Sequence, residues 1–113
     1  MTAYERGDVV LVPFPFTDQT TTKKRPAVVI SSNNYNNASQ DIVIMAITSQ
    51  KEKTFGIGEC MIKNWNEAGL LKPSSIKPAI STIEQKLVLK KLGKFSSEDL
   101  VATDKALKDF LGF

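Results

Sequence analysis

The sequence contains no histidine, and this absence removes several common kinds of active site. Catalytic zinc sites usually include histidine ligands, and nucleophilic serine or cysteine sites usually rely on a histidine base. The acidic residues are scattered along the chain, without the close carboxylate pair of a glycosidase or a two-metal enzyme. The usual zinc triads and the Ser–His and His–His schemes are therefore excluded.

Cysteine is nearly absent as well. Cys60 is the one cysteine of the chain, which excludes an internal disulfide and any metal site built from several cysteines. A reducing compartment fits this usage best. The opening MTAYERGDVV lacks the basic and apolar regions of a signal peptide, and no apolar run approaches membrane-spanning length. We therefore expect a cytoplasmic protein.

The overall composition is that of an ordinary folded domain. The 113 residues are 42% hydrophobic and 24% charged. A chain of this length builds one core, so we expect a single domain over residues 1–113. The net charge of +3 is compatible with a polyanionic partner but does not require one, because electrostatic steering depends on where the charges lie.

Short apolar runs separated by polar turns predict a mainly β fold. Residues 9–12 and 27–31 are rich in strand formers, and DIVIMAITS (41–49) predicts a strand buried on both faces. Pro13 and Pro15 exclude a central-strand ladder there, so the first strand should end at a sheet edge or turn outward. Elsewhere we expect loops at 17–24 and 50–58, a turn-rich connection at 32–40, a short strand within 59–63, a single turn at 64–69, extended segments broken by Pro73 and Pro78, and a short helix followed by a strand within 82–96.

The C-terminal segment has the clearest helical pattern. Ser96 is followed three residues later by Asp99, which is close to a capping box. Residues at helical spacing then follow, namely Leu100, Thr103, Leu107, Phe110 and Leu111. We expect an amphipathic terminal helix docked by this face on a small, strongly curved β-barrel or compact sandwich.

The stretch KKRPAVVIS (23–31) holds the first candidate functional residues. Arg25 offers a fixed fork of donors that matches the oxygens of a phosphate, and Lys23 and Lys24 lie beside it. Pro26 biases the backbone of Arg25 towards an extended conformation and so restricts its direction. A solvated loop cluster explains the same three cations, and the residues alone leave both interpretations open.

The stretch AITSQ (46–50) holds the second group of candidates. An apolar strand ends here in three hydrogen-bonding side chains, Thr48, Ser49 and Gln50. Functional polar groups are common where a rigid strand opens into a loop. The same residues could simply satisfy the turn, and that alternative also stays open.

Aromatic side chains are the third group. Phe14, Phe16, Phe55 and Trp65 could stack on bases. An isolated aromatic residue is more often part of the core. Phe14 and Phe16 are the more interesting pair, because strand alternation puts both on one face at the start of a polar loop.

In order along almost the whole chain, the segments RGDVVLVPFPFTD, KKRPAVVIS, MAITSQ, STIEQKLVLKKLGKFS and the closing helix resemble the MazF/PemK family of toxins. The resemblance implies a small SH3-like β-barrel of the CcdB/MazF type with a C-terminal α-helix, usually as a homodimer. It also implies an endoribonuclease of a type II toxin–antitoxin system, without metal or other cofactor, that cuts single-stranded RNA at short motifs. A cognate antitoxin would neutralise it by covering the RNA site.

By this resemblance, the essential arginine of the family is Arg25 and its essential threonine or serine is Thr48. The 2′-hydroxyl of the RNA would attack the phosphorus, giving a 2′,3′-cyclic phosphate and a 5′-hydroxyl. Arg25 and Thr48 would hold the phosphate and stabilise the developing charge. The expected RNA-binding residues are Lys23, Lys24, Phe16, Asp18, Gln19, Ser49 and Gln50.

The sequence departs from the family pattern in two places. Many members have an acidic residue in a GSEQ-like first loop, where this chain has DQTTTKK with Asp18. Many also have acidic or amide and basic residues before Thr82-Ile83, where this chain has the residues 78–81, PAIS. Two other functions therefore stay open. One is a CcdB-like toxin that binds DNA gyrase, and the other is a degenerate member that binds RNA with little catalysis.

Overall fold

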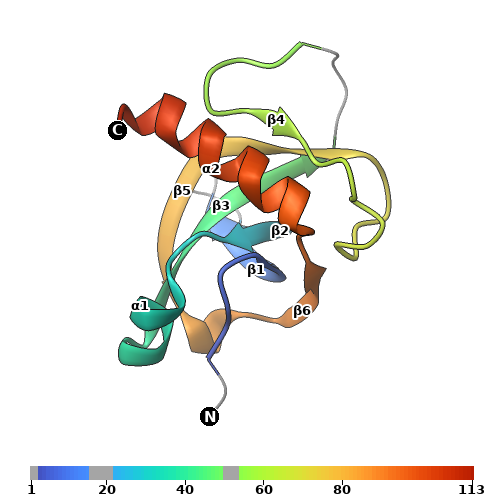
Figure 1. The fold of residues 1–113 in the computed structure, drawn as a ribbon. Helices are drawn as coiled ribbons and strands as arrows, with labels where there is room; N and C mark the ends of the chain where they lie inside the picture. The colour runs from blue at the N-terminus through green and yellow to red at the C-terminus, as the bar shows by residue number, and fades with distance from the viewer. Residues whose placement is uncertain (1–2, 16–21, 50–53) are drawn as a thin grey trace.

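The computed structural model of the chain describes residues 3–15, 22–49 and 54–113. Six strands and a long C-terminal helix make up most of it, which confirms the predicted mainly β architecture (Figure 1). In chain order the elements are β1 (Asp8–Pro15), β2 (Thr22–Val29), α1 (Asn33–Ala38), β3 (Asp41–Ser49), β4 (Cys60–Met61), β5 (Ser74–Glu84), the 3₁₀ turn η1 (Gln85–Leu87), β6 (Lys90–Lys94) and α2 (Ser97–Leu111).

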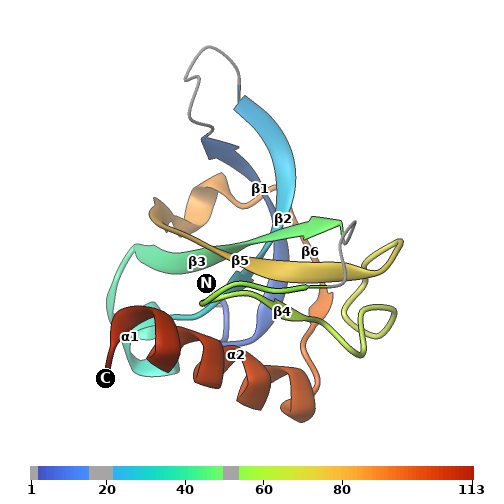
Figure 2. The same cartoon turned by 90° about the horizontal axis from the view of Figure 1, so that it is seen from above.

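The strands form one antiparallel sheet in the order β4-β5-β3-β2-β1-β6. The sheet curls strongly, and α2 lies across one of its faces (Figures 1 and 2). β1 pairs with β6 only from Asp8 to Leu11, and the rest of β1 pairs with β2 alone among the described strands. The first strand thus runs through both of its prolines, and those prolines lie where it forms an edge, as expected.

β3 is buried on both faces, as its apolar run predicts. Met45 and Ile47 belong to a core that also includes Ala106 and Leu107 of α2. Ile42 and Ile44 belong to a second core on the opposite face, with buried residues of β1 and β2. We call these the helix-side core and the far-side core. The rows of side chains that form the far-side core continue along β2 and β3 to the candidate residues Arg25 and Thr48, so this core supports the candidate site.

α2 begins where the capping pattern predicts. The Ser96 hydroxyl accepts a hydrogen bond from the Asp99 N–H, and Thr103 and Leu107 are buried. Phe110 and Leu111 are 42% and 56% exposed, so the expectation that they face the core is wrong. Phe110 approaches Gly58 beside Pro78 with part of its side chain, and the remainder is exposed. None of the described helices is long and apolar enough to cross a membrane.

Three other expectations need correction. β2 begins at Thr22, so Lys23 and Lys24 are strand residues, because they pair with Phe14 and Pro13 across the β1–β2 hairpin. The connection expected at 32–40 contains α1, which Ser32 caps. Pro78 does not break β5, because it lies at an irregularity in the β3–β5 pairing, where a missing N–H costs little.

The segment before β5 is fixed by a buried carboxylate. Asp99 is 2% exposed, and its two oxygens each accept a backbone N–H at 2.9 Å, from Lys63 and Asn64. The turn that follows passes so close to β6 that a Cβ on Gly69 would lie 2.0 Å from the Leu92 carbonyl oxygen. These contacts join the start of α2, the turn and β6 into one packed unit.

Candidate functional site

The three consecutive cations lie on β2, close to the open end of the β1–β2 hairpin. Lys23 and Lys24 are exposed and Arg25 is half-buried. Arg25 lies directly opposite Val12, a buried residue of the far-side core. Side chains of directly opposite residues share a sheet face. Arg25 is therefore held by a strand on the edge of a packed core rather than by a loop.

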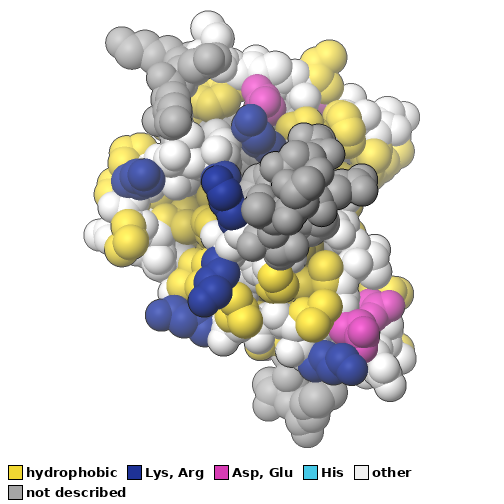
Figure 3. Space-filling view, turned by 180° about the vertical axis from the view of Figure 1, so that it is seen from behind, with side chains coloured by type: hydrophobic (Ala, Val, Ile, Leu, Met, Phe, Trp, Pro, Cys, Tyr) yellow, Lys and Arg dark blue, Asp and Glu magenta, His cyan; other side chains and the backbone are white. Residues whose placement is uncertain are grey.

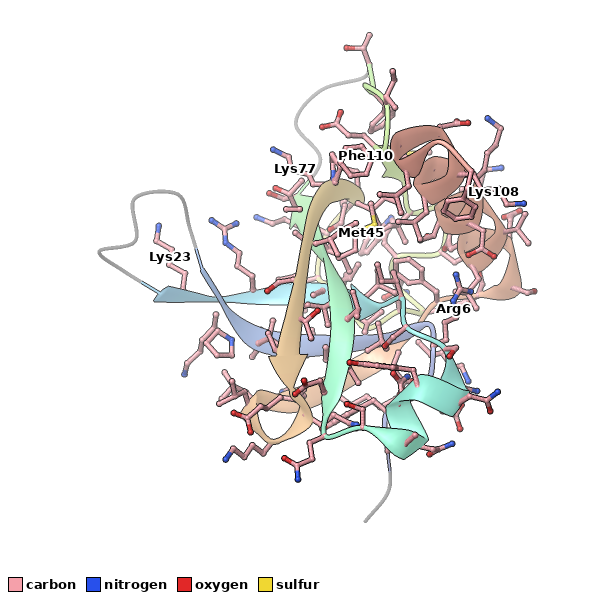
Figure 4. All side chains as sticks on the ribbon, turned by 90° about the vertical axis from the view of Figure 1, so that its left-hand side faces the viewer. Arg6, Lys23, Met45, Lys77, Lys108 and Phe110 are labelled. Carbon is pink, nitrogen blue, oxygen red and sulfur yellow. The ribbon has the colours of Figure 1, made fainter. Side chains whose placement is uncertain are left out.

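Strand alternation assigns the neighbours of Arg25 to faces. Arg25, Ala27 and Val29 are alternate residues, and the last two belong to the far-side core. Lys23 continues this row towards the hairpin end. Lys24 belongs to the opposite row, with Val28 of the helix-side core. Figure 4 shows Lys23 on the side of the sheet away from α2, in agreement with this assignment.

Strand alternation relates Arg25 to Thr48. The paired residues of β2 and β3 are Ala27 with Ala46, Val28 with Met45 and Val29 with Ile44. Arg25 is two residues before Ala27 and Thr48 is two residues after Ala46, so each follows the row of its neighbour. Both residues then belong to the rows of the far-side core, on the face turned away from α2. The two candidate residues share one face at neighbouring strand ends.

The other predicted site residues differ in where they lie. Ser49 pairs with Ser74, and alternation turns it to the face opposite Thr48. Phe16, Asp18, Gln19 and Gln50 lie outside the described residues. The side chain of Phe14 is likewise not described, although its backbone is part of β1. Trp65 packs against the helix-side core, as its core interpretation predicts, and Phe55 is exposed.

A serine that the sequence analysis did not select lies in the same row. Thr48 pairs with Ser75 of β5, and Ser75 pairs in turn with Met61 of β4. Thr48 and Ser75 are therefore directly opposite each other, on the sheet face to which alternation also assigns Arg25. Nothing in SSIKPAIS marks this serine, because its importance depends on a pairing between strands far apart in the chain.

The charge around the site is mainly positive. Figure 3, which views the molecule from behind, shows Lys and Arg side chains gathered among hydrophobic ones, with fewer acidic side chains. Such a surface favours an anionic ligand.

The cysteine thiol and the carboxylates are less suited to act as a nucleophile or as metal ligands. Burial, with a smaller effect of the Asp99 charge, raises the pKa of the Cys60 thiol, so this thiol is a poor nucleophile at neutral pH. Within the part of the chain that the structure describes, no group of three His, Cys, Asp or Glu side chains could hold a metal ion. The guanidinium and hydroxyl groups are the better candidates for binding a phosphate.

The sequence model of the family described as "PemK-like, MazF-like toxin of type II toxin-antitoxin system" matches residues 5–111. The chain belongs to this family. The match spans β1 to α2, so both Arg25 and Thr48 fall within it. A search of curated protein sequences found no match.

Solved structures of MazF/PemK-type toxins have the same fold. An endoribonuclease from Mycobacterial species, in complex with its cognate antitoxin, aligns with a TM-score of 0.79 at 18% identity, over 98% of this chain and 97% of that one. MazF from Deinococcus radiodurans aligns with a TM-score of 0.77 at 16% identity over 100% of both chains. The toxin MazF-mt6 from Mycobacterium tuberculosis gives 0.73 at 15% identity, over 94% of this chain and 97% of that one.

Proposed function

We propose that this toxin-family chain is a metal-independent endoribonuclease that cleaves single-stranded RNA at short sequence motifs. The observation that supports the proposal is strand alternation from Ala27 and Ala46, by which Arg25 and Thr48 belong to the rows of the far-side core. The endoribonuclease activity of similarly folded proteins gives further support. A protein that only binds another protein has no reason to combine a guanidinium and a hydroxyl at this point.

The proposed reaction uses the RNA as its own nucleophile. The 2′-oxygen loses its proton to a water molecule and forms a bond to phosphorus as the bond to the 5′-oxygen breaks, leaving a 2′,3′-cyclic phosphate and a 5′-hydroxyl. Arg25 donates two hydrogen bonds to the phosphoryl oxygens and passes a proton to the departing 5′-oxygen, and it regains that proton from the solvent. Thr48 adds a third donor. Removing one donor of this kind costs about 10²- to 10³-fold in rate.

The surrounding cations would hold the rest of the RNA. Lys23 shares the row of Arg25, and both it and Lys24 are exposed at the hairpin end. Lysines at such positions bind phosphates regardless of sequence, while base recognition needs other groups. We assign that second part to Phe16, Asp18, Gln19 and Gln50, as the family resemblance implies, and leave Ser49 out because alternation turns it to the face opposite Thr48.

The proposal includes two protein partners. Two of the similarly folded proteins were solved with their antitoxins, one from Mycobacterial species and one from Deinococcus radiodurans. We propose an antitoxin for this chain too, covering the basic face. We also propose a homodimer. Exposed apolar residues at the end of α2, namely Phe110, Leu111 and Phe113, support a protein contact there.

The test is incubation of the purified protein with a long single-stranded RNA in EDTA, followed by sequencing of the new 5′ ends. Wild-type protein should give discrete cuts. Arg25→Ala should reduce the rate about 10²- to 10³-fold, and Arg25→Lys should recover little, because a lysine lacks the planar fork. Lys108→Ala is the matched control, since Lys108 is exposed on α2, away from the site (Figure 4).

The outcomes separate the competing functions. Unchanged cleavage by Arg25→Ala would overturn the assignment of the site. RNA binding without cuts by the wild type would indicate a degenerate binder. Neither binding nor cleavage would favour the CcdB-like alternative, which a gyrase-binding assay then tests.

A further inference from the structure

Ser75 has an unusual environment for a serine inside a strand. The residue is only 6% exposed, and its hydroxyl makes no hydrogen bond to any residue that the structure describes. The adjacent Ser74 is also buried, but its hydroxyl donates to the Lys72 carbonyl at 2.9 Å. Among the described residues, Asp8 Oδ1 is the one buried side-chain polar atom without a hydrogen-bond partner, so the Ser75 oxygen reaches the surface. Ser74 thus has a clear role in the fold, whereas Ser75 has a donor still to be used.

Thr48 lies beside this donor. The two residues are directly paired between β3 and β5, so their Cβ atoms are about 5 Å apart on the same face. The Thr48 hydroxyl also makes no hydrogen bond to the described residues, and none joins it to Ser75. Two neighbouring hydroxyls that leave each other free can both donate to one group with several acceptor oxygens, such as a phosphate.

Lys77 continues the same row of β5. Ile76 belongs to the helix-side core, and Pro78 faces the same way, because a Cβ on Gly58 would touch both Pro78 and Phe110. Alternation therefore turns Lys77 to the face of Ser75. Figure 4 shows Lys77 on the side away from α2, as it shows Lys23.

The charge of Lys77 is available to a ligand. The side chain is exposed, and it forms no ion pair with any described residue. Two residues of strand place its Cα about 6.6 Å from that of Ser75. If Ser75 binds one phosphate of an RNA strand, the flexible Lys77 ammonium at this spacing can reach the adjacent phosphate of that strand.

We infer that β5 forms the second wall of the RNA site. Ser75 donates to the phosphate that Thr48 holds, and Lys77 binds the adjacent phosphate of the same strand. This inference rests on the proposed ribonuclease function and adds residues to it. It also explains why the hydroxyl of Ser75 is left unused by the fold.

The Ser75 contact is tested by single-turnover cleavage with saturating protein. Ser75→Ala should lower the cleavage rate about tenfold or more, with an unchanged urea midpoint, and Ser75→Thr should restore most of the rate. Ser74→Ala is the matched control on the same strand. It should lower the urea midpoint and leave the saturated rate near that of the wild type. A wild-type rate for Ser75→Ala, or a loss matched by a lower urea midpoint, would overturn the Ser75 contact.

The Lys77 contact is tested by RNA affinity as a function of salt. Lys77→Met should weaken binding and reduce the slope of log K against log salt by about 0.7, the value for one phosphate contact on a single strand. Lys108→Met, an equal loss of charge on α2, should leave that slope unchanged. Equal slopes for wild type and Lys77→Met would overturn the Lys77 contact.

Failure of this inference differs from failure of the proposed function. If the wild type cuts RNA in EDTA and both β5 variants behave as wild type, the second wall is wrong and the ribonuclease remains. If the wild type neither cuts nor binds RNA, the proposed function fails and this inference fails with it. If the wild type binds without cutting, the salt slope of Lys77→Met still decides the phosphate contact.

Discussion

Replacing Asp99 with alanine should destabilise the fold strongly, since one side chain holds two segments together. Its carboxylate accepts backbone N–H groups from Lys63 and Asn64, both at 2.9 Å, and it lies at the N-terminal end of α2. Ala would leave both N–H groups without their acceptor. It would also remove a negative charge that favours the helix start.

The magnitude follows from these contacts. Hydrogen bonds to a charged group contribute about 1.5–3 kcal/mol each, so the loss of two costs about 3 kcal/mol at the lower limit. Urea slopes for small proteins are about 1–3 kcal/mol per molar, so the midpoint should fall by about 1–3 M without a change of slope. Asp99→Asn keeps one acceptor oxygen and should lie between wild type and Ala.

The assay is urea unfolding followed by circular dichroism, at one protein concentration, because dimerisation would make the midpoint depend on concentration. Asp109→Ala is the matched control. Asp109 is an exposed residue of the same helix whose one ion pair with the described residues is with Lys105 at the surface, so its loss should cost less than about 0.5 kcal/mol. A cost below about 1 kcal/mol for Asp99→Ala would show that the carboxylate does not hold the segments together.

Two further predictions concern the packing and charge of the same half of the molecule. Gly69→Ala should cost more than about 2 kcal/mol in urea unfolding, because Gly69 has φ of +82° and its Cβ would meet the Leu92 carbonyl oxygen; a cost near zero would contradict this close approach. The hydrogen bond and charge of Lys94 lower the pKa of the Glu5 carboxyl, so the pair stabilises the fold above the unfolded-state pKa and stops doing so as the pH falls through the folded-state pKa. The urea midpoint of wild type should therefore exceed that of Glu5→Gln near neutral pH and approach it in acid, and a difference independent of pH would refute this pairing.

Much of the fold could be predicted from local patterns. The apolar run of β3 and the capping sequence at Ser96 both led to the correct elements. The errors arose where a distant contact decided the structure. Lys23 and Lys24 look like loop residues, but the pairing with β1 extends the strand through them. Phe110 continues the apolar pattern of α2, but its side chain is only partly covered.

The residues of the candidate site also differ in whether local sequence patterns can identify them. Arg25 and Thr48 could be selected from the sequence through a family resemblance, because each lies in a recognisable motif. Ser75 could not, because its position beside Thr48 depends on the β3–β5 register. The register shifts between Met45 and Ile47, so the partner of Thr48 cannot be found by counting residues along the two strands.

The most direct test of the central claim is a crystal structure of the protein with an RNA that carries its cleavage motif and a 2′-deoxy nucleotide at the cut. Without the attacking hydroxyl, the RNA stays intact in the site. Our account predicts that the Arg25 guanidinium and the Thr48 hydroxyl both lie within hydrogen-bond distance of the same uncut phosphate. An RNA bound with that phosphate on another face of the sheet, or with only one of the two residues touching it, would contradict the account.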